Sequence, residues 1–263
     1  MRSLFLMFAA IIIGLLSFSC QHLPKLNADS EPPKVSQNIN QEKPRDSSAN
    51  WEEYKSLLFV DQSLEEMVKT HDKPDDVFAQ AHKYVGEGKP EEAKRVLKRS
   101  LNDPEQEVRF RLWIWNALRQ LGEKPPPKIA DEVQGVVLEI PIENYIDTLA
   151  AYSDGRARYV NTQGKGGAII WETTEESRIT ALVRDLIDAA EPLVGKATLI
   201  ARHRPTEPHV IRVSILTYGG LRMIEVRQDS DLSNDPALTA LLDAGTKLFH
   251  ALLDEHEKAK QKR

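Results

Sequence analysis

The spacing of hydrophobic residues changes three times along the chain, and each change marks a different kind of segment. Residues 4–16 are uncharged and apolar, whereas residues 21–50 are polar almost throughout. Residues 51–124 carry apolar positions at helical spacing, and from residue 128 onward short strand-like runs are interspersed with two helical stripes. The pattern predicts a leader, a linker without a core, a helical segment and an α+β unit.

The leader comprises residues 1–20. Arg2 precedes the apolar run, which is the order of a secretory signal. The run is too short for a comfortable membrane span, which takes ~20 apolar residues. It ends in Leu16, Ser17, Phe18, Ser19 and Cys20, so the single cysteine of the chain follows a small residue at the expected cleavage point.

This ending resembles the lipobox of bacterial lipoproteins, although Leu16 lies one place further out than in the commonest pattern. The resemblance implies cleavage before Cys20 and palmitate-type acyl chains on a diacylglyceryl-modified Cys20. The anchor is then lipid, and two acyl chains hold stably because each buried methylene contributes ~0.8 kcal/mol. Gln21 at the second mature position, in place of Asp, favours the outer membrane of the cell envelope. The alternative is an uncleaved or ordinarily cleaved signal.

Residues 21–50 are rich in Pro, Ser, Asn, Gln and charged residues and cannot bury enough apolar surface to fold. We expect a disordered tether with an average span of ~30 Å. Because Cys20 is the only cysteine, no disulfide forms within the chain, and the fold depends on its own core.

The helical segment, residues 51–124, begins with one or two amphipathic helices that break near Asp61 and Ser63. A helical hairpin is expected next, with its turn at Gly88-Lys89-Pro90, followed by a helix from Glu105 to Leu121 that ends at Gly122. Trp113 and Trp115 lie two apart and so point to different helix faces, which predicts one buried and one exposed tryptophan.

The order Ala81, Tyr84, Gly88, Ala93, Leu97 and Pro104 resembles a tetratricopeptide repeat (TPR). The resemblance covers about one and a half repeats and implies a peptide-binding groove. At least three repeats are normally needed for a stable array. We therefore favour the other interpretation, a helical layer that packs on the rest of the protein.

Beyond the boundary at Pro125-Pro126-Pro127, residues 128–263 are predicted to form an α+β domain. Asp154-Gly155 is typical of a tight hairpin turn with Gly155 at positive φ. Thr173 and Glu176 form a candidate capping box for the first covering helix, and Asp235-Pro236 opens the second. Strands are expected at 136–142, 148–152, 156–160, 168–171, 210–216 and 221–226.

The expected fold is therefore α+β, with N-terminal TPR-like helical hairpins followed by an antiparallel sheet and two covering helices. The layout of the second part resembles profilin or roadblock-type domains. Residues 147–165 also resemble a segment of uncharacterised bacterial proteins, a resemblance that implies no activity.

The net charge of the chain argues against nucleic acid as a partner. The whole chain has a formal net charge of −5, and removal of the leader, with Arg2 as its only charge, makes it −6. Such a chain offers no basic surface for nucleic acid. Its content of charged and hydrophobic residues is that of an ordinary soluble protein.

The sequence contains no recognisable catalytic, cofactor or metal motif. His203 and His209, and likewise His250 and His256, are six residues apart and are expected to be solvated. The glycine-rich residues 164–167 lack the spacing of a phosphate-binding loop, and we expect a hairpin loop there. The acidic residues Glu139, Glu143 and Asp147 are interpreted as charges at strand edges, although a carboxylate-based hydrolase stays open.

Two functions from different classes follow. The first is a lipid-anchored envelope protein that acts as a protein-binding or scaffold module, with an unidentified protein partner. The second is an envelope hydrolase with an unrecognised active site in the α+β domain. A deep cleft with convergent ionisable groups would favour the enzyme, whereas an apolar groove would favour binding. The helical hairpins and the tether would hold a partner close to the membrane, and neither supplies a catalytic group. Binding is therefore favoured.

Overall fold

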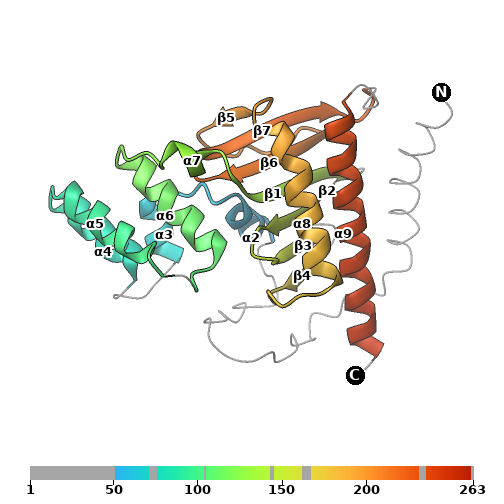
Figure 1. Cartoon of the computed structure of the whole chain (residues 1–263), viewed down its shortest axis with the longest axis horizontal. Helices are drawn as coiled ribbons and strands as arrows, with labels where there is room; N and C mark the ends of the chain where they lie inside the picture. Colours follow the sequence, from blue (N-terminus) through green and yellow to red (C-terminus); the bar gives the residue numbers. More distant parts are fainter. Residues whose placement is uncertain are drawn as a thin grey trace.

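The structure is a computed structural model. It describes residues 51–70, 76–103, 105–142, 145–161, 167–230 and 235–261. Cys20, the tether, Pro104, Glu143 and residues 162–166 lie outside these ranges. The lipid anchor and the tether therefore stay predictions, and the described chain has three layers: a helical segment, a sheet, and two long helices (Figure 1).

The helical layer comes from the first half of the described chain. Its elements are α2 (Trp51–Ser56), the 3₁₀ turn η1 (Leu57–Phe59), α3 (Leu64–Thr70), α4 (Val77–Gly86), α5 (Pro90–Ser100), α6 (Val108–Gln120) and α7 (Pro127–Ala130). The turn at Gly88 has φ +71° and Pro90 is the first residue of α5, as expected from the sequence. Gly122 ends α6 with φ +81°.

The central layer is a seven-stranded antiparallel sheet with the order β4-β3-β2-β1-β6-β7-β5. Its strands are β1 (Val133–Ile142), β2 (Tyr145–Tyr152), β3 (Ala157–Asn161), β4 (Gly167–Trp171), β5 (Thr198–Ile200), β6 (Val210–Thr217) and β7 (Gly220–Arg227). This confirms the α+β class. The short edge strand β5 was not expected, because three residues are too few to show a period.

The third layer covers one face of the sheet. It consists of α8 (Arg178–Ala190), the 3₁₀ turn η2 (Glu191–Leu193) and α9 (Pro236–Gln261), and α8 and α9 lie side by side on the sheet in Figure 1. The core between them is apolar, with Leu138, Val213 and Leu248 at 1% exposure or less. Asp235 caps α9 through the backbone N–H of Ala237.

The capping box of α8 differs from the expectation. Ser177 is the N-cap, and its hydroxyl accepts from the backbone N–H of Thr180, whose hydroxyl in turn accepts from the N–H of Ser177. The Thr173 hydroxyl instead accepts from the backbone N–H of Glu175, before the helix begins. The helix therefore starts later than the Thr173-Glu176 spacing suggested, because Ser177 and Thr180 make the same reciprocal bonds.

Gly155 closes the β2–β3 hairpin at φ +92°, as predicted. The Gly155 N–H donates to the carbonyl of Tyr152, and the Tyr152 N–H donates to the carbonyl of Arg156. The connection is thus a three-residue loop with one left-handed residue and not a two-residue primed turn. A Cβ on Gly155 would lie 2.8 Å from Cγ2 of Thr180, so α8 also packs closely against this turn.

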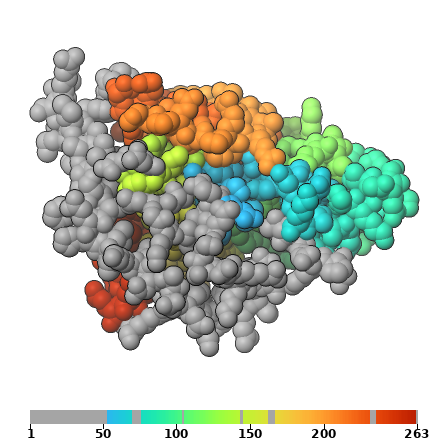
Figure 2. All heavy atoms as spheres, turned by 180° about the vertical axis from the view of Figure 1, so that it is seen from behind, coloured from blue at the N-terminus to red at the C-terminus, as the bar shows by residue number. Residues whose placement is uncertain are grey.

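The helical layer covers the opposite face of the sheet and shares a second core with it. Side chains of α6, such as Ile114 and Leu118, are buried together with Val137, Ala150 and Leu216 of the strands. In the view from the opposite side, the blue segment that starts at Trp51 lies next to the orange segment of β5 to β7 (Figure 2). The helices are thus a layer on the sheet.

The two tryptophans of α6 correct one expectation, since both are buried. Trp113 is 7% exposed and Trp115 is 9% exposed. The Trp113 indole N–H donates to the side-chain oxygen of Gln62, and the Trp115 ring contacts that of Tyr218. Trp113 contacts the segment between η1 and α3, and Trp115 contacts the β6–β7 turn, so α6 is covered on more than one face.

Candidate functional site

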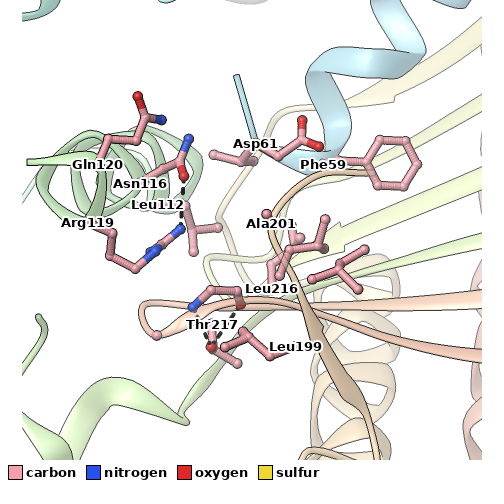
Figure 3. Close-up of a pocket in the computed structure, with 15 residues that line it drawn as sticks. Phe59, Asp61, Leu112, Asn116, Arg119, Gln120, Leu199, Ala201, Leu216 and Thr217 are labelled. Carbon is pink, nitrogen blue, oxygen red and sulfur yellow. Dashed lines mark hydrogen bonds between the residues drawn. The ribbon is translucent and has the colours of Figure 1, made fainter. Parts of the chain in front are cut away.

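A cavity of about 380 Å³ lies between the helical layer and the β6–β7 end of the sheet (Figure 3). Its walls come from the segment after η1, from α6, from β5 and from the β6–β7 hairpin. The lining residues are Phe59, Val60, Asp61, Leu112, Asn116, Arg119, Gln120, Leu199, Ile200, Ala201, Leu216, Thr217, Gly219, Gly220 and Leu221. This volume is at the small end of the ~300–1,000 Å³ range of small-molecule sites.

Most of the cavity wall is apolar. Leu112 of α6 faces Leu216 of β6 and Leu221 of β7 across it, and all three side chains are buried. Leu199 of the edge strand β5 is 57% exposed, which is unusual for a large apolar side chain in this structure. The cavity therefore presents a hydrophobic surface that continues to an exposed apolar side chain.

Arg119 is the one cation in the lining. Its Nη1 donates to the carbonyl oxygen of Tyr218 at 2.5 Å. Its Nη2 donates to Oδ1 of Asn116 at 3.1 Å, the bond drawn between these two side chains in Figure 3. No ion pair joins Arg119 to a carboxylate among the described residues. Burial without a counter-ion lowers the pKa of Arg119 to about 10.

Asp61 is the one carboxylate in the lining and lies on the η1 side of the cavity. Its Oδ2 accepts from the backbone N–H of His203 at 2.5 Å. Burial raises the pKa of Asp61, and the His203 N–H and the nearby charges of His203 and Arg202 oppose that rise. Asp61 thus fixes the loop after β5 to the helical layer.

Backbone strain is present at the same wall. Val60, between two lining residues, has φ +55° and ψ +36°, the left-handed conformation that a β-branched residue rarely adopts. Such strain costs on the order of 1–3 kcal/mol and persists where the surroundings hold it, often at functional sites. It turns the chain so that Phe59 and Asp61 both reach the cavity.

Next to the cavity, a buried group of charges connects the sheet to the helical layer. Glu139 of β1 is fully buried; its Oε1 lies 3.1 Å from Nζ of Lys55, and its Oε2 lies 2.9 Å from Nε2 of His203 and 3.5 Å from Nη1 of Arg212. Burial alone would raise the pKa of Glu139, but the bond to His203 and the charges of His203 and Lys55 outweigh it and hold the pKa below its ordinary value.

Strand register explains why these groups meet. Glu139 pairs directly with Arg212 of β6, which pairs with Glu225 of β7. Arg212 donates to Glu225 at 2.6 Å and to the carbonyls of Arg204 and Pro205. The ring of His203 stacks on Phe59 with centroids 3.6 Å apart. This group, Lys55, Glu139, His203 and Arg212, is called the Glu139 cluster below.

The structure corrects the expectation that His203 is solvated and that Glu139 is an edge charge. Both are parts of the Glu139 cluster, and the side chain of His203 is only 15% exposed. Glu139 and Asp147 also cannot form a carboxylate pair, because Glu139 faces the helical layer whereas Asp147 shares its face with Leu149, toward α8 and α9. The one feature of the sequence that could have indicated the buried position of Glu139 is that this charged residue interrupts the apolar run of β1.

The polar groups of the Glu139 cluster and of the cavity lining are already bonded to protein partners or, like Arg119, lack a counter-ion. In the Glu139 cluster every charge is paired. The only hydroxyl in the cavity lining, that of Thr217, bonds to the backbone of Gly220 as donor and acceptor. Among the described residues no cluster of His, Cys, Asp and Glu has the arrangement of a metal site, and no described helix is long and apolar enough to span a membrane.

Comparison with known proteins assigns the chain to no family. The chain matches no protein-family model, and neither the curated proteins nor the solved structures include one similar enough to count as a match. The function therefore has to be argued from the cavity itself.

Proposed function

We propose that this chain is a lipid-anchored binding protein of the bacterial cell envelope, with the cavity beside Arg119 as its binding site. The observation that carries the proposal is a small, mostly apolar cavity that contains a guanidinium without a carboxylate partner. Pockets of this kind, apolar with a few convergent polar groups, are the usual form of ligand sites.

Binding explains the cavity better than hydrolysis does. A hydrolase needs a nucleophile or activated water beside a base, and the lining contains only Thr217 and Asp61 as candidates. The Thr217 hydroxyl and an Asp61 oxygen are already bonded to Gly220 and to His203. Glu139 and Asp147, the two of the three candidate carboxylates that the structure describes, lie on opposite faces of the sheet and form no pair.

In this proposal the TPR-like helices serve as a wall of the site and not as a separate peptide groove. Helix α6 provides four lining residues of the cavity, whereas α4 and α5 provide none. Helices α4 and α5 extend away from the sheet (Figure 1) and stabilise α6 from outside, where Phe78 of α4 contacts Phe110 of α6.

The anchor is part of the proposal. Cys20, by its resemblance to a lipobox cysteine, carries the acyl chains that hold the protein at the outer membrane. In cells fed an alkyne-labelled palmitate, the wild-type chain should take up the label and be cleaved before Cys20. Cys20→Ala should lose both, and a variant that is still labelled would contradict the anchor.

The binding site is tested by photo-crosslinking in the envelope. A photoreactive residue in place of Leu199, at the exposed end of the cavity, should give an adduct. The matched control places it at Ile170, which is also an apolar residue of an edge strand and 49% exposed, but far from the cavity in the sheet order. The adduct should disappear with Ala201→Trp, which fills the cavity from an exposed position.

Two results would contradict this function. One is no adduct at position 199, and the other is an adduct that survives Ala201→Trp. The mass of the adduct distinguishes a protein partner from a small ligand. A protein partner is the expectation from the sequence.

A further inference from the structure

Arg119 differs from three other arginines that lie between the helical layer and the sheet. Arg109 lies 2.8 Å from Glu107, Arg158 lies 2.5 Å from Glu172, and Arg212 lies 2.6 Å from Glu225. Arg119 has only neutral oxygens as partners, from Tyr218 and Asn116. Arg119 is half-buried, and a cation that is withdrawn from water without a counter-ion is unfavourable, so a ligand that supplies the anion would be favoured there.

The guanidinium of Arg119 is held in one orientation. The Tyr218 carbonyl and the Asn116 amide fix two of its nitrogens, which leaves the remaining N–H groups for a ligand. Gly220 keeps space beside it, because a Cβ at this position would lie 4.0 Å from Nε of Arg119 and 2.8 Å from Cδ1 of Leu199. A planar carboxylate suits such a rigid fork of donors.

The rest of the lining limits the ligand further. Leu112, Leu216 and Leu221 require an apolar group beside the anion. Asp61 lies on the other side of the cavity from Arg119 in Figure 3 and would repel a second negative charge. The ligand therefore carries a single negative charge next to an apolar group.

We infer that the cavity binds a small apolar molecule with one carboxylate, and that Arg119 is the counter-ion of this carboxylate. The inference rests on the proposed function and names its ligand class. The same chemistry occurs in a medium-chain fatty acid and in the C-terminal residue of a peptide, so both sources are tested.

The experiment measures binding of octanoate and of its neutral analogue octanamide to the full chain in lipid nanodiscs, by calorimetry. Partition into the lipid is measured with the Ala201→Trp variant, in which the cavity is filled, and is subtracted. Octanoate should bind at least ~10-fold more tightly than octanamide, the effect of charge-assisted hydrogen bonds in a partly buried site. Arg119→Gln should remove this difference and leave octanamide binding as it was.

Arg184→Gln is the matched control. Arg184 is an exposed arginine of α8, on the other side of the sheet, and pairs with Glu176. Its substitution should change neither affinity, which excludes a general effect of net charge.

Equal binding of octanoate and octanamide would overturn the inference but leave the proposed binding function, provided that both are lost in Ala201→Trp. No binding of either probe would overturn the inference, and the crosslink at position 199 would then decide on the function alone. N-acetyl-leucine and its amide distinguish the sources. Tighter binding of N-acetyl-leucine than of octanoate supports a peptide terminus, and the reverse order supports a fatty acid.

Discussion

The two faces of the sheet are buried in different ways. Toward α8 and α9 the contacts are mostly apolar, with Leu138, Val213 and Leu248 as typical members. Toward the helical layer, charged side chains such as Glu139 and Arg212 are buried as deeply, at 0% and 2% exposure. One face is thus a hydrophobic core, and the other is an interface that carries paired charges and the cavity.

Two carboxylates show the consequence of this difference. Glu139 is surrounded by Lys55, His203 and Arg212, and its pKa is lowered. Asp147, on the α8–α9 face, accepts from Asn161, and burial raises the pKa of Asp147 to about 7 against the opposing effect of a bond from Tyr159. Similar burial therefore has opposite effects, because only Glu139 has cationic partners.

The largest expected effect comes from removing the charge of Glu139. Glu139→Gln leaves Lys55 and Arg212 buried with less compensation, and removal of one partner of a buried pair costs ~3–5 kcal/mol of unfolding free energy. Denaturant unfolding at pH 7 measures the loss. Glu225→Gln is the control, since Glu225 binds the same Arg212 but is 39% exposed, and it should cost less than ~1 kcal/mol. Equal losses in both variants would contradict the comparison.

The pH dependence of stability should differ in the same way. The pKa of Glu139 is lower in the folded chain than in the unfolded chain, where it is ~4.3. Its contribution is therefore fully present above that value and is lost as the pH falls through the folded-state pKa. Glu139→Gln should therefore flatten the loss of stability that the wild type shows below about pH 4.3, the unfolded-state pKa of Glu139.

A smaller effect of opposite sign is expected from Asp147→Asn. The folded-state pKa of about 7 exceeds the unfolded value of ~3.9, so the unfolded chain releases its proton first and wild-type stability falls as the pH rises between them. The Asn variant lacks this loss and should be more stable at pH 8 by roughly 2–4 kcal/mol, with little difference at pH 4. A variant that is less stable at pH 8 would show that Asp147 has a charged partner.

The sequence predicted the elements on both faces well, and for different reasons. The apolar runs of β1 and β6 and the turn at Gly155 depend on local composition and on glycine geometry, both of which are visible in one segment. The α8 cap was misplaced because Ser177 and Thr173 both fit the local rule. Strand β5 is only three residues long and is ordered by pairing with β7, which is a tertiary effect.

The site could not be predicted in the same way. Glu139, Lys55, His203 and Arg212 come from α2, β1, the loop after β5 and β6, and only the antiparallel register brings them together. The same holds for Arg119, whose sequence neighbours resemble those of any exposed arginine near the end of a helix. Its lack of a carboxylate is a property of the assembled layers and not of α6.

The most direct test of the account is a nuclear magnetic resonance measurement of Arg119 itself. The Nε–H signal of Arg119, assigned by its loss in Arg119→Gln, should shift on addition of octanoate and saturate, since the carboxylate becomes its counter-ion. Octanamide, which brings no charge to the guanidinium, should shift the signal less at saturation. A signal that does not respond to octanoate, or responds equally to both compounds, would contradict the assignment of Arg119 as the carboxylate-binding residue.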